Sequence, residues 1–386
     1  MSGYDAIVVG LGAVGSATAW QLASRGARVV GFDRFRPPHA MGSSTGRSRI
    51  IREAYFESPF YVPIVRRAYE LWGELEGHTG RQLVRRTGGL VIGPPQGSLV
   101  TGALASAEAH GVEHQRLTPA EVRRLYPPFQ PDDALIGVWE SRAGVLNPEE
   151  CIGTMLQEST RAGAELRFDE PVLEWLADGD GVEVRTGMGR VAARRLVLAA
   201  GAWMAGTLPG ADLPLEVARQ TMFWIRPRDQ SNQAWFTPER CPVWLWETPG
   251  GRMYYGFPDL GDGPKVARHH GGPIVNPETV DRQVHPEEAN ELLGFLDQAI
   301  PSLGGEVSDA RVCLYTNTPD EHFLLDRHPE HPAVLLASPC SGHGFKFAPA
   351  LGEALADRVM DEPSRLDLSP FRLSRFAGQH PSIAKS

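Results

Sequence analysis

Short apolar runs and one helical stretch dominate the first 33 residues. Residues 6–9 are all apolar, and a run this short and uninterrupted is typical of a strand buried on both faces. Residues 29–32 form a second strand-like run, which ends at Asp33. Between the two runs lie three glycines and a helical segment, so the pattern predicts strand, glycine turn, helix and strand.

The rest of the chain divides into helical and strand-like segments. Apolar residues recur at helical spacing between residues 59 and 75, which predicts an amphipathic helix. Residues 220–275 are rich in tryptophan, tyrosine and glycine, which is consistent with an antiparallel sheet that walls a pocket. Further helices are predicted at residues 101–110, 119–125, 149–163, 286–299 and 347–360, and further strands at residues 88–95, 165–185, 196–200 and 332–340.

Segments typical of dinucleotide binding occur at the start of the chain, near residue 195 and at the end, and the aromatic segment lies between them. This order predicts an α/β protein in which a Rossmann-like domain is interleaved with an antiparallel-sheet substrate domain. The Rossmann-like domain is expected to comprise residues 1–85, 145–215 and 310–386. The substrate domain is expected to comprise residues 86–144 and 216–309.

The three glycines after the first strand match G-x-G-x-x-G. Gly10 permits the tight turn, Gly12 lets a pyrophosphate approach the backbone, and Gly15 allows the helix to pack closely on the strand. The helix N-terminus favours phosphates, and Asp33 is placed to accept both ribose hydroxyls. The motif fits NAD and FAD equally, whereas its position at the start of the chain favours FAD. The strand ending in Gly201 either returns to this site or is a further core strand.

Composition and charge exclude several classes of protein. The chain has 386 residues and a net charge of −9, without a basic run, which argues against a nucleic-acid partner. The four cysteines are too few and too dispersed for a disulfide scaffold, so we expect a reduced, cytoplasmic setting. No apolar run approaches the length of a membrane-spanning helix, and no histidine or carboxylate cluster has metal-ligand spacing.

Four motifs occur in a fixed order: GRSRIIREAY, YYGFPDLGDGPK, CLYTNTPDEHFLLD and SGHGFKF. Together they closely resemble the monomeric sarcosine oxidases and N-methyl-amino-acid oxidases, within the D-amino-acid-oxidase-like flavoproteins. The resemblance extends from Tyr4 to about Asp357. It implies a covalently attached FAD, a secondary amine or amino acid as substrate, molecular oxygen as electron acceptor, and a monomer.

Cys313 begins the third motif without a second cysteine at redox or metal-ligand spacing. By its residue type alone it is either buried filler or a thiol with one specific role. The resemblance matches it to the cysteine whose sulfur bonds the 8-methyl carbon of the flavin. A thiolate is a suitable nucleophile for that reaction.

Four cations have family counterparts. Arg52 and Lys346 match the pair that binds the substrate carboxylate, and an arginine fork suits this role. Arg52 follows two isoleucines and Lys346 lies between two phenylalanines, and a charge in such surroundings usually has a partner. Arg49 and Lys265 match cations that lie against the flavin ring, with Lys265 as the oxygen-activating lysine. Solvated surface charges are the alternative for Arg52, Lys346 and Lys265.

Other matched positions line the expected pocket. His269 and Tyr315 match pocket residues, and His269 either assists amine deprotonation or is a polar surface residue. Trp244, Leu245 and Trp246 predict a bulkier wall than the aliphatic segment of the relatives. The backbone N–H groups of the Gly342–Gly344 turn are expected to face the flavin pyrimidine oxygen. Further candidates near cofactor or substrate are Ser44, Thr45 and Tyr55.

The resulting hypothesis is a flavin-dependent oxidase that converts an N-methyl or cyclic secondary amino acid to an imine and reduces oxygen to hydrogen peroxide. One alternative keeps the oxidase and changes the substrate to a proline- or pipecolate-type imino acid, or to a bulkier N-methyl amino acid. A second alternative is an FAD dehydrogenase that passes electrons to a protein partner. A third is a flavin-binding protein without catalytic activity.

Overall fold

The first apolar run forms the centre of a parallel sheet in the computed structural model, which describes residues 3–179, 181–208 and 213–377. β1 (Tyr4–Val9) lies between β2 (Val29–Phe32) and β12 (Gly189–Leu198), and all three are parallel. β9 (Glu165–Arg167) and β19 (Val334–Ser338) extend the parallel set on either side. All residues of β2 and β19 and the last four of β1 are buried, as expected for parallel strands that are covered on both faces.

Short antiparallel additions complete this eight-stranded sheet. β10 (Val172–Asp178) and β11 (Gly181–Thr186) form a hairpin on β12, and β18 (Leu324–Arg327) pairs with β19. Helix α1 (Ala13–Ser24) packs against α5 (Pro148–Arg161) and α7 (Ala348–Met360). The predicted Rossmann-like arrangement is confirmed.

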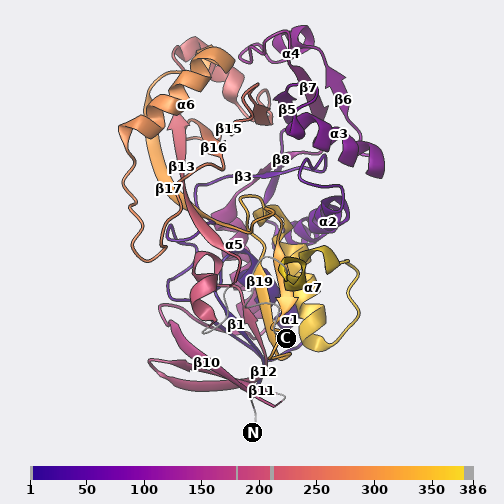
Figure 1. The fold of residues 1–386 in the computed structure, drawn as a ribbon, viewed down its shortest axis with the longest axis vertical. Helices are drawn as coiled ribbons and strands as arrows, with labels where there is room; N and C mark the ends of the chain where they lie inside the picture. The colour runs from indigo at the N-terminus through magenta and orange to yellow at the C-terminus, as the bar shows by residue number, and fades with distance from the viewer. Residues whose placement is uncertain (1–2, 180, 209–212, 378–386) are drawn as a thin grey trace.

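A second eight-stranded sheet has the strand order β17-β13-β16-β15-β14-β5-β7-β6 and occupies the upper half of Figure 1. Its pairs are antiparallel except for β14 and β5, which run parallel. The predicted sheet therefore extends beyond the aromatic segment. Its strands are β5 (Gly89–Gly93), β6 (Gln115–Leu117), β7 (Ile136–Glu140), β13 (Glu216–Ile225), β14 (Val243–Glu247), β15 (Met253–Asp259), β16 (Pro264–His269) and β17 (Val307–Asn317).

A three-stranded sheet of β3 (Arg49–Ile51), β8 (Gly144–Leu146) and β4 (Val84–Arg86) lies between the two large sheets (Figure 1). Three of the predicted domain boundaries fall inside strands, at β4, β8 and β17. The division into domains therefore stays a prediction, and residues 378–386 of its last segment lie outside the described residues.

The remaining helices follow their local signals. α2 (Tyr61–Thr79) buries one apolar stripe and ends at Gly80, whose φ of 70° is left-handed. α4 (Pro119–Leu125) begins with a capping box formed by Thr118 and Glu121. No helix among the described residues is long and apolar enough to span a membrane. The others are α3 (Ser98–His110), α6 (Pro286–Ala299) and the 3₁₀ turns Gly201–Thr207, Gln230–Phe236, Pro301–Leu303, Phe345–Phe347, Ser369–Phe371 and Leu373–Phe376.

Gly15 allows α1 to approach the strand that precedes it. A Cβ atom at Gly15 would lie 1.7 Å from the carbonyl oxygen of Gly10, so any side chain would force the backbone apart. We expect Gly15→Ala to lower the free energy of unfolding by at least about 3 kcal/mol. Urea unfolding followed by circular dichroism measures this change.

Gly73 provides the matched control because it is exposed in the middle of α2 and a Cβ there meets no atom within 4 Å. Gly73→Ala should raise stability by up to about 1 kcal/mol through helix propensity. A Gly15→Ala protein as stable as the wild type would contradict the packing argument.

Candidate active site

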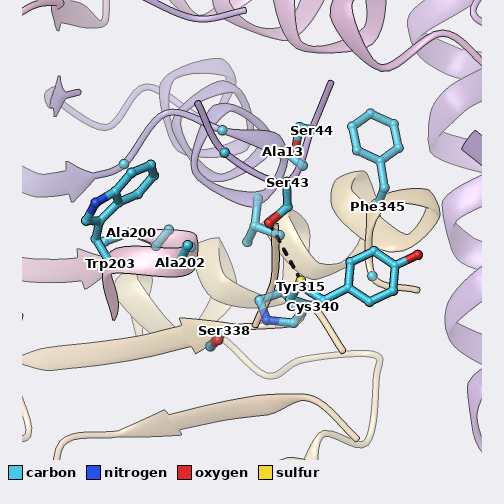
Figure 2. Close-up of a pocket in the computed structure, with 18 of the residues that line it drawn as sticks. Ala13, Ser43, Ser44, Ala200, Ala202, Trp203, Tyr315, Ser338, Cys340 and Phe345 are labelled. Carbon is cyan, nitrogen blue, oxygen red and sulfur yellow. Dashed lines mark hydrogen bonds between the residues drawn. The ribbon is translucent and has the colours of Figure 1, made fainter. Parts of the chain in front are cut away.

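A cavity of about 710 Å³ is lined by residues from both large sheets and from the loops between them. Figure 2 shows part of this lining: Ala200 and Trp203 follow β12, Ser43 and Ser44 precede β3, and Tyr315 belongs to β17. The strand predicted near residue 196 therefore does return to the predicted dinucleotide site. The lining divides into a glycine-rich group and a cationic, aromatic group.

The glycine-rich group has the features of a dinucleotide site. Gly10 has a φ of +88°, and a Cβ added at Gly12 would meet no protein atom within 4 Å. The first residues of α1 line this part of the cavity, so the positive end of the helix dipole faces it, and no side chain caps this end of the helix. The Asp33 carboxylate accepts hydrogen bonds from the N–H groups of Leu11 at 2.7 Å and Phe35 at 2.9 Å. These residues fit the pyrophosphate and ribose of FAD.

Arg52 dominates the cationic group. Its guanidinium donates to the Ala54 carbonyl and to Glu57 Oε2, both at 2.8 Å, and lies over the rings of Tyr55 and Phe56. Burial lowers the pKa of Arg52, but Glu57, Tyr55 and Glu140 together outweigh it, so the pKa is raised overall. The sequence analysis did not identify Glu57, although the need of a buried cation for a partner is a signal for it.

Glu57 is itself incompletely paired. Its Oε1 atom is buried without a hydrogen-bond partner, and the neutral His343 ring is 3.9 Å away at Nδ1. Burial raises the pKa of Glu57, while the charges of Arg52 and Lys346 lower it, and the net direction is downward. The cavity therefore contains a carboxylate beside the cation that is expected to bind a carboxylate.

Lys346 is held by a chain of neutral groups. Its Nζ donates to the His343 carbonyl at 2.7 Å and to the Tyr55 hydroxyl at 3.1 Å. Burial lowers the pKa of His343 to about 3, so the ring is neutral. Its Nε2 lies 3.0 Å from the Glu321 carbonyl and must donate there, which leaves Nδ1 to accept from Tyr55 at 2.7 Å. Burial also lowers the pKa of Lys346 to about 7.

Arg49 and Lys265 both donate hydrogen bonds to backbone carbonyls of residues 43–48. Arg49 lines the cavity and donates to the carbonyls of Ser48 at 2.7 Å and Ser43 at 2.6 Å. Lys265 donates to Gly46 at 2.8 Å and to the same Ser48 carbonyl at 2.7 Å. Burial lowers the pKa of Lys265 well below its usual value. The structure therefore brings the two cations together, with Lys265 behind the segment that forms the cavity wall.

Cys313 also lies behind the wall. It pairs with Gln220 across β17 and β13, is 1% exposed, and packs in one apolar cluster with Tyr315, which lines the cavity. Burial raises the pKa of the Cys313 thiol, while the charges of Arg49 and Lys265 act in the opposite direction. The two cations that the resemblance assigns to the flavin thus also favour the thiolate of Cys313.

The tryptophan wall expected from the sequence is wrong in part. Leu245 lines the cavity, but Trp244 and Trp246 pack on the opposite face of the sheet against Phe129 and Phe295. Neighbouring residues of a strand point to opposite faces, so Leu245 and its two flanking tryptophans cannot all face the cavity, and in this structure Leu245 does. That alternation was available in the sequence.

Aromatic rings complete the wall. Phe56, Tyr255, His269 and Tyr315 line the cavity beside Leu245, and the Phe56 ring meets His269 edge-on with centroids 6.3 Å apart. Burial, followed by nearby positive charge, lowers the pKa of His269 well below its usual value, so its ring is neutral. His269 is therefore a pocket residue rather than a surface histidine, and the sequence analysis missed Phe56.

Two backbone N–H groups of the turn before α7 do not face the flavin side as expected. The N–H groups of His343 and Gly344 both donate to the Cys340 carbonyl, at 2.9 and 3.1 Å, so they are used within the turn. Gly342 has a φ of +76°, and a Cβ at Gly344 would lie 1.6 Å from the Pro339 carbonyl oxygen. The glycines are thus needed for the shape of the turn.

The residues singled out in the sequence form two layers. Those that line the cavity are Gly10, Gly12, Asp33, Ser44, Arg49, Arg52, Leu245, His269, Tyr315, Gly342, Gly344 and Lys346. Those that are buried outside the lining are Gly15, Thr45, Tyr55, Lys265 and Cys313.

Comparisons with known proteins agree with this geometry. The model of the family "DAO: FAD dependent oxidoreductase" matches residues 5–358. The chain is 44% identical to a monomeric sarcosine oxidase of Streptomyces avermitilis, over 97% of this chain and 98% of the relative. It is 36% identical to an N-methyl-L-tryptophan oxidase of Salmonella arizonae, over 97% and 99%.

Solved structures show the same fold at lower identity. NikD, an amino acid oxidase of nikkomycin biosynthesis, superposes with a TM-score of 0.85 at 24% identity, covering 96% of this chain and 98% of NikD. An L-proline dehydrogenase of P. horikoshii superposes with a TM-score of 0.82 at 23% identity, covering 97% and 98%. Fold and site together define an FAD-dependent oxidoreductase. The chain belongs to the DAO family of these enzymes.

The low pKa of Lys346 predicts pH-dependent anion binding. Propionate, a carboxylate without an oxidisable amine, should bind the flavin-loaded protein more tightly below pH 7, where Lys346 is protonated, than above it. We expect its Kd to rise about tenfold between pH 6 and 8.5, since one charged hydrogen bond is lost while Arg52 stays charged. Titration followed by the flavin absorbance measures the Kd.

Lys346→Met serves as the control, because its Kd for propionate should stay high and flat over the same pH range. A wild-type Kd that does not change between pH 6 and 8.5 would show that Lys346 does not contribute a titrating charge.

Proposed function

We propose that this protein is a flavin-dependent oxidase of secondary amino acids, with oxygen as acceptor and hydrogen peroxide as product. The observation that carries the proposal is the pair of buried cations, Arg52 and Lys346, in a cavity that also has the features of a dinucleotide site. The sarcosine oxidase and N-methyl-L-tryptophan oxidase relatives act, by their names, on amino acids of this kind.

The chain's own residues account for substrate binding. The substrate carboxylate takes the Arg52 fork and the Lys346 ammonium, and it competes there with Glu57 Oε2. Neutral His269 and the Tyr315 ring flank the amine end without imposing a positive charge that would repel an ammonium group. Phe56 and Leu245 exclude water from the carbon that loses hydrogen.

FAD, when bound, would accept a hydride, which is one proton with two electrons, from the carbon next to the amine and would pass the two electrons to oxygen. Arg49, together with Lys265 when it is protonated, supplies positive charge on the cofactor side of the cavity, which stabilises negative charge that develops there. Lys265 favours oxygen as acceptor over a protein partner. We further propose that the protein is a cytoplasmic monomer and that Cys313 holds the flavin covalently.

The substrate side chain remains to be assigned among three classes: sarcosine, a bulkier N-methyl amino acid, and a cyclic imino acid. Leu245 and Phe56 replace the two tryptophans as the residues that decide between them, because these side chains line the cavity. The first test is therefore a substrate panel.

In air, the flavin-loaded enzyme should form one peroxide for each oxygen consumed with at least one of sarcosine, N-methyl-L-tryptophan, L-proline and L-pipecolate. The methyl ester of the best substrate should lose activity by at least about 10²-fold, because esterification removes the charge that Arg52 and Lys346 bind. A peroxide assay coupled to an oxygen electrode measures both quantities.

Lys265→Met separates oxidase from dehydrogenase. It should slow reoxidation of the flavin by oxygen roughly 10²-fold and leave its anaerobic reduction by substrate nearly unchanged. Turnover of the wild type with a dye acceptor but without peroxide would contradict the oxidase and favour the dehydrogenase.

Cys313→Ala tests the covalent link. Acid precipitation of the wild type should leave the yellow colour with the protein, whereas the variant should release FAD into the supernatant. Cys340→Ala is the matched control, because Cys340 is the other cysteine near the cavity and lies 3.9 Å from Ser43 Oγ (Figure 2). Release of FAD from the wild type, or its retention by Cys313→Ala, would contradict the assignment.

A further inference from the structure

Glu140 is a buried carboxylate in the second sheet that the account of the site has not used. It is the last residue of β7, pairs with Gly89 of β5, and is only 5% exposed. Its two oxygens accept hydrogen bonds from two consecutive backbone N–H groups: Oε1 from Glu53 at 2.9 Å and Oε2 from Ala54 at 2.6 Å. The Glu140 carboxylate of the second sheet thus binds the backbone of residues 53 and 54, which follow β3 of the three-stranded sheet.

That piece of backbone directly follows Arg52. The Arg52 guanidinium folds back on it and donates to the Ala54 carbonyl at 2.8 Å. The segment at residues 53–54 is therefore fixed by Glu140 at its N–H groups and in turn supports the Arg52 side chain at its carbonyl. A shift of this segment would move the guanidinium relative to the cavity.

We propose that Glu140 is a positioning residue for substrate binding: it anchors the backbone that sets the position and direction of the Arg52 guanidinium. This inference rests on the proposed function, in which Arg52 binds the substrate carboxylate. Glu140 does not line the cavity, so it acts through Arg52 and not on the substrate.

The surroundings leave Glu140 free for this role. The neighbouring Glu53 side chain is directed to Arg66 Nε at 3.0 Å and Arg142 at 2.6 Å, so these arginines do not occupy Glu140. Burial raises the pKa of Glu140, and the N–H groups of Ala54 and Glu53 together with the Arg52 charge oppose that shift. The two backbone N–H groups are the hydrogen-bond partners that stabilise the buried carboxylate.

The second sheet contains a matched control. Glu247 ends β14, is 6% exposed, and accepts hydrogen bonds from the consecutive N–H groups of Ser98 at 3.3 Å and Leu99 at 2.9 Å. It has the same chemistry as Glu140 but anchors the start of α3 instead of the Arg52 segment. Glu140→Gln leaves one buried N–H without an acceptor, and Glu247→Gln leaves one at the start of α3, so the control measures the cost of removing such an anchor at a distance from Arg52 in the sequence.

The test measures binding of propionate and of uncharged propionamide to flavin-loaded wild type and both variants, by flavin absorbance. We expect Glu140→Gln to raise the Kd of propionate about tenfold, with the Kd of propionamide unchanged within about twofold. Glu247→Gln should change neither. Glu140→Asp, which keeps the charge on a shorter side chain, should give a smaller effect in the same direction and replaces Glu140→Gln if that variant does not fold.

Three outcomes overturn the inference in distinguishable ways. If Glu140→Gln bound propionate with the same Kd as the wild type, the hydrogen bonds of Glu140 would not position Arg52. If Glu140→Gln weakened the binding of propionate and of propionamide equally, or if Glu247→Gln also weakened propionate binding, the cause would be general destabilisation. A wild type that binds propionate no better than propionamide would contradict the carboxylate site of the proposed function itself.

Discussion

Three buried cations in one small region impose the main physical constraint on this structure. Removing a charge from water costs several kcal/mol unless a partner compensates. The fold meets this cost differently at each residue: Arg52 has the Glu57 carboxylate, Lys265 has two backbone carbonyls, and Lys346 has a carbonyl, a hydroxyl and a pKa of about 7. Arg52 and Lys346 thus place positive charge at one part of the cavity lining, and a substrate carboxylate is attracted there.

Each of the two large sheets supplies one part of the cavity lining. The parallel sheet directs the glycine turn and the start of α1 to one part of the cavity, while the second sheet supplies Leu245, His269 and Tyr315 to the other. Arg52 belongs to neither sheet, because it follows β3 of the small middle sheet. Its position therefore depends on contacts with both neighbours, which explains why a strand end of the second sheet anchors the backbone beside it.

Periodicity and glycine spacing were enough to predict the parallel sheet and its helices, because each of these leaves a local pattern, whereas the cations of the site were assigned through the resemblance to the sarcosine oxidases. The bounds of α4 and α6 are the same as the ranges predicted from the sequence, residues 119–125 and 286–299. Sequence reasoning failed where tertiary contacts decide. Glu57 and Glu140 act through partners that no spacing rule brings together, and the His343 N–H group is used by its own turn. Strand alternation predicts that Trp244 and Trp246 face away from Leu245, but tertiary packing decides which of the two faces lines the cavity.

The most direct test of the account compares sarcosine with N-methylethylamine, which has a methyl group where sarcosine has its carboxylate. The measurement is the rate of flavin bleaching without oxygen, in the wild type and in Arg52→Ala. The account predicts a wild-type preference for sarcosine of at least about 10³-fold in the ratio of the limiting bleaching rate to the apparent Kd of the substrate, falling by at least about 10²-fold in the variant. Equal preferences in the two proteins would contradict the claim that buried positive charge selects the substrate.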